Sequence, residues 1–115
     1  RVLSGRRELL APDLIWAEVG NVLWKKSSRA EIPSEVVRAI LRDFRRFPLQ
    51  TYTAGTLLDL AWDLAERFRI SVYDSLYLAL AVNRDCKLLT ADRQFYDTVK
   101  RAPFASTLVW VEQIQ

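Results

Sequence analysis

The chain has 115 residues, a length that fits one domain, and half of them are hydrophobic, which is enough for one core. It contains no histidine, which excludes Ser–His–Asp and Cys–His catalysis as well as histidine-ligated zinc. Its single cysteine, Cys86, excludes an intrachain disulfide and is predicted to be a small core residue in a reducing cytosol. The net charge of +3 is compatible with a phosphate-rich partner. No apolar run reaches the roughly 18 residues of a membrane span, and the given N-terminus lacks a basic-then-apolar pattern, so secretion is not expected.

The first half of the chain is predicted to hold two helices between two short strands. The expected elements are, in order, the tail of a polar helix at residues 1–7, a strand at 9–11, helices at 13–28 and 34–47, and a strand at 49–53. Asp13 and Ser34 are of the type that caps helix N-termini. Pro12 and Pro48 are expected to end the element before them, because the residue before a proline disfavours helical geometry.

The second half alternates helices with shorter strands. The expected elements are helices at 56–68 and 72–83, a strand at 87–90, a helix at 92–100 and a strand at 107–111. The helix at 56–68 is amphipathic, with an Asp63–Arg67 pair on its outer face. The helix at 72–83 is apolar almost all round and is predicted to be buried. This order of elements predicts an α/β fold of three layers, a parallel central sheet flanked by helices on both faces.

Three carboxylates do not lie on polar faces. Glu18 projects at the edge of the apolar stripe of its helix, and the alternative is that it extends outward toward Lys25 or Asn21. Asp74 opens the buried helix, where an uncompensated charge is costly. Asp92 directly follows a strand, and ligands of open parallel sheets bind beyond the carboxyl ends of strands. For both aspartates the alternative is a helix N-cap.

Together these carboxylates suggest an acidic cluster at one end of the sheet. Like charges raise each other's pKa unless a cation neutralises them. Mg²⁺ or Mn²⁺ with oxygen ligands is the usual solution, and such an ion activates water and stabilises charge on a phosphate. With no histidine available, a metal-dependent hydrolase of phosphodiesters is the favoured catalytic class.

Three segments resemble the acidic motifs of PIN domains. Residues 11–25, with Glu18 before Val and Asn in a helix that follows a short strand and Pro, resemble the second motif. Residues 71–81, which begin Ser-Val-Tyr-Asp, resemble the third, and residues 88–95, Leu-Leu-Thr-Ala-Asp-Arg-Gln-Phe, resemble the fourth. The VapC branch of toxin–antitoxin pairs fits best, by chain length and by the helical pair within residues 13–47.

The resemblance implies a cytosolic, Mg²⁺- or Mn²⁺-dependent endoribonuclease. It also implies a homodimer that is silenced by a cognate antitoxin, whose C-terminal segment occupies the acidic groove. By similarity, Asp74 would be a direct metal ligand. Glu18 and Asp92 would bind the metal directly or through water and position the attacking hydroxide. Thr90 would hydrogen-bond within the acidic cluster; the alternative is that it is a strand residue of high β propensity.

The chain departs from the family pattern at its start. PIN domains carry a first acidic residue, an Asp, on an N-terminal central strand, and no such strand precedes Glu18. The chain also begins with Arg1 and contains no Met. We therefore expect residues 1–115 to be a single PIN-like domain lacking its N-terminal strand, with about two dozen residues absent upstream.

Three other functions compete with this interpretation. A PIN-like fold that has lost an acid would serve as a non-catalytic dimerisation or antitoxin-binding module. A phosphoacceptor receiver domain would need a Lys before Pro near the C-terminus, but Lys100 is misplaced for that role relative to Pro103. A plain nucleic-acid binder would use the basic residues of the first two helices. Trp24, beside Lys25, is the tryptophan that we expect to face a partner.

Overall fold

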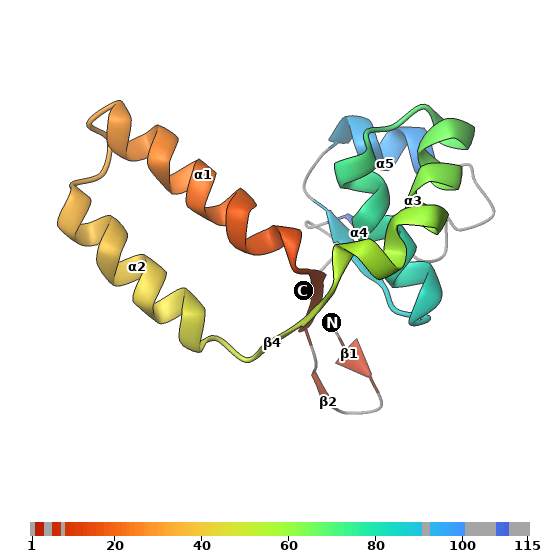
Figure 1. The fold of residues 1–115 in the computed structure, drawn as a ribbon, viewed down its shortest axis with the longest axis horizontal. Helices are drawn as coiled ribbons and strands as arrows, with labels where there is room; N and C mark the ends of the chain where they lie inside the picture. Colours follow the sequence, from red (N-terminus) through yellow and green to blue (C-terminus); the bar gives the residue numbers. More distant parts are fainter. Residues whose placement is uncertain (1, 4–5, 8, 91–92, 101–107, 111–115) are drawn as a thin grey trace.

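The computed structural model describes residues 2–3, 6–7, 9–90, 93–100 and 108–110, and its elements follow the predicted order from residue 9 onward (Figure 1). The elements are β1 (Val2–Leu3), β2 (Arg6–Arg7), β3 (Leu9–Pro12), α1 (Leu14–Ser28), α2 (Ser34–Arg46), β4 (Leu49–Tyr52), α3 (Ala54–Phe68), α4 (Val72–Asn83), β5 (Leu88–Thr90), α5 (Arg93–Val99) and β6 (Leu108–Trp110). No helix in this described part of the chain is both long enough and apolar enough to cross a membrane.

The N-terminal segment differs from its prediction. Residues 1–7 were expected to be the tail of a helix, but β1 and β2 pair antiparallel, with Val2 opposite Arg7 and Leu3 opposite Arg6. Ser4 and Gly5 stand between the two strands in the sequence, and a Ser-Gly step is typical of turns. The local sequence therefore favours a hairpin over a helix.

The longer-range strand pairs are parallel, as the order of elements predicts. β3 pairs with β4 from Leu9–Leu49 to Pro12–Tyr52, and the crossover between them is the α1–α2 pair. β5 pairs with β6 from Leu88–Leu108 to Thr90–Trp110, with α5 between them in the chain. Among the described residues the two pairs are separate ladders rather than one continuous sheet. Parallel pairs joined through helices confirm the α/β class.

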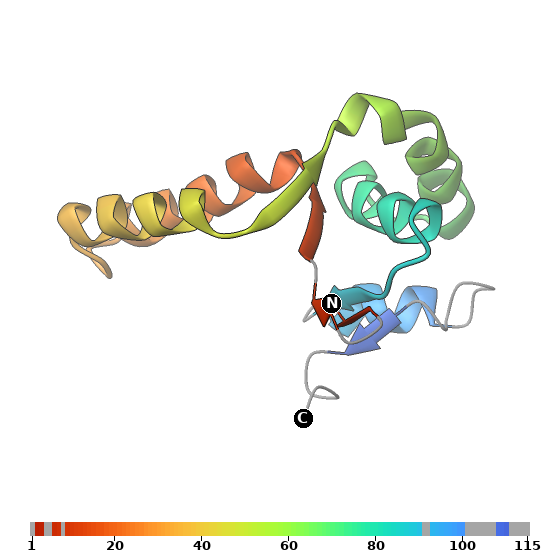
Figure 2. The same ribbon diagram turned by 90° about the horizontal axis from the view of Figure 1, so that it is seen from below.

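Helices α1 and α2 form an antiparallel hairpin that projects away from the rest of the molecule (Figures 1 and 2). The rings of Trp16 and Phe44 meet edge to face at 5.0 Å near the base of the hairpin. Leu23 is the one buried residue of α1, and α2 has none. The N-cap of α2 is Pro33, which makes no side-chain capping bond. Ser34, which was predicted to be the N-cap, is the first residue of the helix.

Asp13 occupies the N-cap position of α1 but does not cap that helix. Its backbone is in the αR region (φ −65°, ψ −11°), whereas a capping side chain needs an extended backbone. The Asp13 carboxylate accepts a hydrogen bond from the Ala54 N–H at 3.1 Å instead. The Asp13 N–H donates to the Tyr52 carbonyl at 2.8 Å. Asp13 therefore fastens the start of α1 to the junction between β4 and α3.

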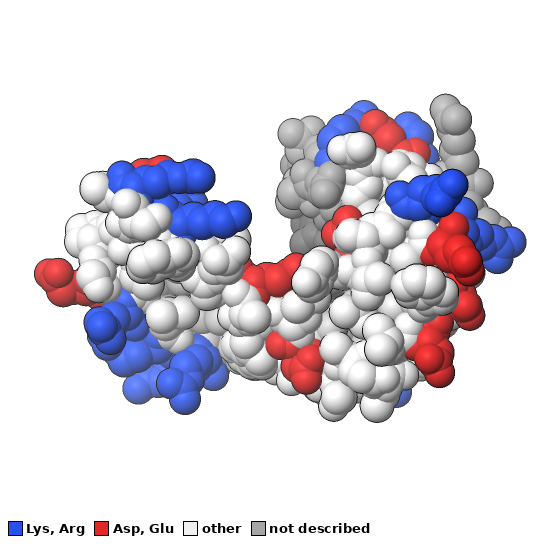
Figure 3. Space-filling model, turned by 45° about the horizontal axis from the view of Figure 1, so that its top comes forward, with Lys and Arg blue, Asp and Glu red and all other residues white. Residues whose placement is uncertain are grey.

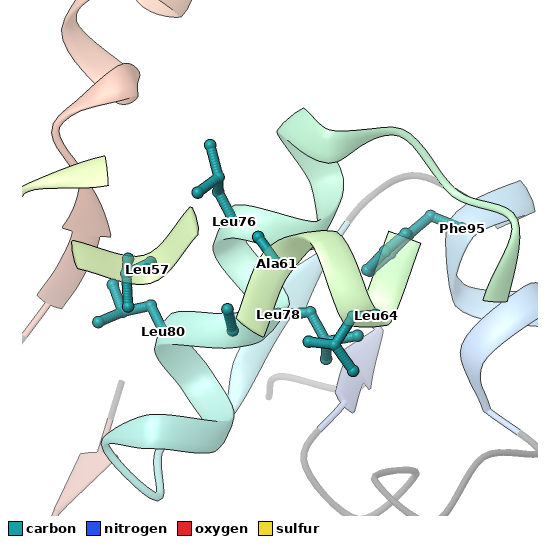
Figure 4. Packing of buried hydrophobic residues seen from close by; sticks show 8 residues of the cluster. Leu57, Ala61, Leu64, Leu76, Leu78, Leu80 and Phe95 are labelled. Carbon is teal, nitrogen blue, oxygen red and sulfur yellow. The ribbon is translucent and has the colours of Figure 1, made fainter. Parts of the chain in front are cut away.

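The core is built around α4, which is buried on most of its sides, as its composition predicts. Leu78 and Ala79 of α4 and Ala61 of α3 have no exposed surface. Figure 4 shows α3 packing across α4, with Phe95 of α5 closing one end of the same cluster. The buried members of the cluster are Leu57, Ala61, Leu64, Leu76, Leu78, Ala79, Leu80 and Phe95. Cys86 is buried as well, which confirms its predicted core role.

Helix α3 begins two residues before the predicted start and presents the expected faces. Leu57, Ala61 and Leu64 are buried, and Asp63 is exposed. The predicted Asp63–Arg67 ion pair is not formed among the described residues. The Arg67 guanidinium lies over the Phe68 ring at 5.8 Å from its centroid instead.

Leu78→Ala tests the place of α4 in the core. The substitution removes a fully enclosed side chain, so we expect the free energy of unfolding to fall by about 2–5 kcal/mol. The measurement is urea unfolding followed by circular dichroism. Leu58→Ala is the matched control, because Leu58 is 50% exposed, and it should change the free energy of unfolding by about 0.5 kcal/mol or less. Equal losses in the two variants would contradict a core centred on α4.

Candidate functional site

Glu18 is held against α4 rather than projecting into solvent. It lies on α1, and its side chain is half-buried. The Tyr77 hydroxyl, on α4, donates a hydrogen bond to Glu18 Oε1. No ion pair joins Glu18 to Lys25 in the described part of the chain, so the alternative based on that pairing is wrong. The carboxylate is positioned by tertiary contact with the buried helix.

Tyr77 is a site residue that sequence reasoning missed. It stands three residues after Asp74 on α4, a spacing that places the two side chains on neighbouring positions of one helix face. The sequence offered one sign of this role, a tyrosine hydroxyl within a largely apolar helix. A buried tyrosine usually has a hydrogen-bond partner. The partner, Glu18, is 59 residues away in the sequence, so no local pattern could identify it.

The pKa of the Tyr77 hydroxyl depends on both predicted carboxylates, Glu18 and Asp74. Burial raises the pKa of the Tyr77 hydroxyl far above its ordinary value of 10. The hydrogen bond to Glu18 and the negative charges of Glu18 and Asp74 raise this pKa further, because each disfavours the phenolate. Both anions are therefore close enough to act on one phenol. Glu18 lies at the contact between α1 and α4, and Asp74 stands three residues before Tyr77 on α4.

The N-cap of α4 is Ser71, not Asp74. Ser71 Oγ accepts a hydrogen bond from the Asp74 N–H at 3.0 Å, and the Ser75 hydroxyl donates to the Ser71 carbonyl at 2.8 Å. Asp74 itself lies in the first turn, where a negative charge is favoured by the helix dipole. The capping bond uses the backbone of Asp74, so its carboxylate is not consumed by the cap.

Asp74 also lines an open, polar pocket of about 210 Å³ between the start of α4 and α5. The other lining residues are Arg69, Ile70, Ser71, Gln94, Phe95 and Thr98.

The side chains of two predicted site residues, Asp92 and Thr90, lie outside the part of the chain that the structure describes. Asp92 lies outside the described residues, immediately before α5 in the chain. Thr90 ends β5, and its side chain lies outside the described part as well.

The residues present fit a hard divalent cation. Glu18 and Asp74 supply carboxylate oxygens, the donors that Mg²⁺ and Mn²⁺ prefer. Tyr77 engages Oε1 of Glu18 and leaves Oε2 to other partners. Within the described ranges no three acidic or cysteine side chains form a group that could hold a metal. A third acidic ligand would therefore have to come from the remaining residues.

The face of α1 that carries Glu18 continues with basic side chains. Lys25 and Arg29 follow Glu18 by seven and eleven positions, which places them within about 20° of its direction around the helix. Both are exposed, and α2 packs on the opposite side, where Leu23 is buried. Figure 3 shows a recess between the hairpin and the body, with acidic side chains at its floor and basic ones on the hairpin.

Comparison with known proteins establishes the family. The family model for the PIN domain matches residues 1–101. The chain belongs to the PIN domain family. Ribonuclease VapC3 of Pyrobaculum aerophilum is 35% identical to this PIN domain over 96 residues, which cover 82% of the chain and 73% of that protein. Ribonuclease VapC9 of Mycobacterium tuberculosis is 31% identical over 98 residues, covering 85% and 76%. Ribonuclease VapC1 of the same organism is 37% identical over 83 residues, covering 71% and 61%. These relatives place the PIN domain among the VapC-type members.

Tyr77→Phe tests the contact between α1 and α4. In an alkaline titration followed by tyrosinate absorbance, we expect one of the four tyrosines to ionise well above pH 10 and this delayed step to vanish in the variant. The folded pKa exceeds the unfolded one, so Tyr77 contributes stability below pH 10 that is lost as the pH rises further.

Glu18→Gln is the companion variant. It removes the negative charge and keeps a hydrogen-bond acceptor, so the delayed step should move toward pH 10 without reaching it, because burial remains the largest cause. A delayed step that is unchanged in Glu18→Gln would show that Glu18 does not act on Tyr77.

Proposed function

We propose that this PIN domain is a divalent-metal-dependent endoribonuclease that acts in the cytoplasm as the toxin of a VapBC-type toxin–antitoxin pair. The observation that carries the proposal is the hydrogen bond that holds Glu18 against α4, three residues along that helix from Asp74, in a chain that belongs to the PIN family and resembles proteins named VapC ribonucleases. Two carboxylates that act on one phenol, with no histidine in the chain, favour hydrolysis assisted by a cation held by oxygen atoms.

Asp74 is proposed as the direct ligand of Mg²⁺ or Mn²⁺, with Glu18 and Asp92 completing the set directly or through water and Thr90 supporting it. The cation would lower the pKa of a water molecule and neutralise charge on the phosphate. The chain's own residues orient these groups. Tyr77 fixes the Glu18 carboxylate through Oε1, so Oε2 is the oxygen available to receive a proton from water. The Ser71 cap fixes the backbone of Asp74 at the start of a buried helix.

The basic face of α1 supports RNA as the substrate. Lys25 and Arg29 lie on the same side of the hairpin as Glu18, and both are exposed. Neither side chain has an ion-pair partner among the described residues. Their charges are therefore available to phosphates on one side of a bond cleaved at Glu18.

A homodimer and a cognate antitoxin are the proposed protein partners. Large apolar side chains remain exposed on the hairpin and on α3: Val22, Trp24, Val36, Phe47, Leu58 and Trp62. Trp24, suspected from sequence of facing a partner, is 66% exposed. Apolar surface of this extent is typical of interaction sites. Sedimentation equilibrium measures the dimer directly, and a monomer at all concentrations would overturn that part of the proposal.

The competing function is a non-catalytic module that binds an antitoxin or dimerises. It retains the same exposed apolar surface but requires no cation at Glu18 and Asp74. Titration of the protein with Mn²⁺, followed by calorimetry, separates the two functions. Stoichiometric binding that is weakened in Asp74→Asn supports the metal site, whereas the absence of binding supports the module.

Asp74→Asn tests the enzymatic proposal. The change keeps the shape of the side chain and the backbone bond to Ser71 but removes the charge that holds the cation. We expect cleavage of a labelled mixed RNA pool in Mg²⁺ or Mn²⁺ to fall by about a thousandfold or more. EDTA should abolish wild-type cleavage in the same assay.

Asp63→Asn is the matched control. Asp63 is an exposed aspartate on α3, so its loss should leave cleavage unchanged while altering net charge by the same amount. Cleavage that survives EDTA, or that survives Asp74→Asn, would contradict a metal-dependent site centred on Asp74. Circular dichroism of each variant would show that the fold is retained.

A further inference from the structure

Arg69 adopts a backbone conformation that arginine does not favour. It follows the last residue of α3 with φ 57° and ψ 44°, and its N–H donates to the Ala65 carbonyl. This left-handed C-terminal position is usually taken by glycine, because a side chain there meets its own backbone. An arginine at such a position keeps strain that glycine would relieve.

The Arg69 side chain lines the same pocket as Asp74. It makes no ion pair and no ring contact among the described residues. Two other arginines are engaged: Arg67 lies over the Phe68 ring, and Arg84 lies over the Tyr52 ring at 5.1 Å. Arg69 therefore offers an uncommitted guanidinium at a pocket that already holds a candidate catalytic carboxylate.

The pocket lining fits an anion lying beside a cation. Ser71 and Gln94 place a hydroxyl and an amide group around it, Asp74 adds one carboxylate, and the Thr98 hydroxyl donates to the Gln94 carbonyl at 2.8 Å. A carboxylate attracts a divalent cation, and a guanidinium binds a phosphate through two parallel N–H donors. A stacked nucleobase fits less well, because the Phe95 ring in this pocket is only 6% exposed and belongs to the core cluster.

We propose that Arg69 binds a phosphate of the RNA backbone adjacent to the phosphodiester that is cleaved at Asp74. The inference rests on the proposed ribonuclease function and extends it, because it assigns the pocket as a substrate phosphate subsite. Arg69 fixes the position of the strand, while Asp74 and its neighbours act on the bond that is cut. The strained backbone places the guanidinium at the pocket rather than serving the stability of α3.

The test is binding of a fluorescent single-stranded RNA in EDTA, measured by anisotropy over a series of NaCl concentrations. Arg69→Gly should raise Kd about tenfold or more. The slope of log K against log salt should fall in magnitude by about 0.7, the value for one lost phosphate contact on a single strand. The melting temperature should stay the same or rise, because glycine relieves the backbone strain. A purely structural role for Arg69 predicts the opposite change in stability and no change in slope.

Three further variants in the same RNA-binding assay separate the loss of a phosphate contact from changes in backbone strain or net charge. Arg69→Asn also tolerates the left-handed backbone and removes the charge, so it should repeat the binding loss if the glycine variant folds poorly. Ala30→Gly relieves the same backbone conformation (φ 60°) at the tip of the hairpin and should leave Kd unchanged. Arg67→Gln removes one positive charge two residues away and should leave the salt slope close to that of the wild type.

Cleavage kinetics in Mn²⁺ distinguish this inference from the function on which it rests. Wild-type cleavage with a raised KM in Arg69→Gly supports both. Wild-type cleavage with KM and salt slope unchanged in Arg69→Gly and Arg69→Asn overturns the phosphate subsite and leaves the ribonuclease intact. A wild-type protein that neither binds nor cleaves RNA overturns both.

Discussion

The burial of α4 is the constraint on which the rest of the structure depends. This helix is apolar on nearly every side, so it is stable only if other elements cover it. Helix α3 covers one side, α5 contributes Phe95 at one end, and Leu10 of β3 and Leu88 of β5 pack against the same cluster. Because α4 is enclosed in this way, the polar residues of its first turns are held in fixed positions. Asp74 and Tyr77 are thus carried by one of the most rigid parts of the chain.

Two polar contacts tie α1 to this core, and together they set the position of Glu18. Asp13 joins the start of α1 to the beginning of α3 through the Ala54 N–H, and Tyr77 reaches across from α4 to Glu18 itself. The first contact fixes where the helix begins, and the second fixes one of its side chains. Neither contact is strong alone in free energy, because a net hydrogen bond contributes about 1 kcal/mol. Their value lies in orientation, since a candidate catalytic carboxylate must be held in one geometry before a cation or substrate arrives.

The hairpin of α1 and α2 exposes both charged and large apolar side chains. Glu18 of α1 meets Tyr77 of α4, and the exposed basic side chains of Lys25 and Arg29 follow it toward the tip of the hairpin. Other parts of the hairpin leave Trp24, Val36 and Phe47 exposed, which suits apolar partners. Val22, which is 53% exposed, lies on the same side of α1 as Glu18, so charged and apolar side chains are interspersed along this projecting element.

The sequence by itself predicted the order of elements from residue 9 onward and the α/β class, while the roles it assigned to site residues remain predictions. Periodicity located α4 and predicted its burial, because an apolar helix has no other stable environment. It also singled out Glu18 and Asp74, because a charged carboxylate beside apolar side chains is costly unless it has a partner. Their resemblance to PIN motifs agrees with the family match. The places of Asp92 and Thr90 in the acidic cluster remain predictions.

Only the tertiary structure decided which groups meet. Local rules assigned Asp13 to the cap of α1 and Asp63 to Arg67, but the Asp13 carboxylate bonds to Ala54, and Arg67 lies over Phe68. The same rules had no means of pairing Tyr77 with Glu18 across 59 positions or of placing Arg69 beside Asp74. Capping, helical spacing and hydropathy act over a few residues, so they predict elements and faces. The partner of a polar side chain depends on how those faces pack, which is a property of the whole fold.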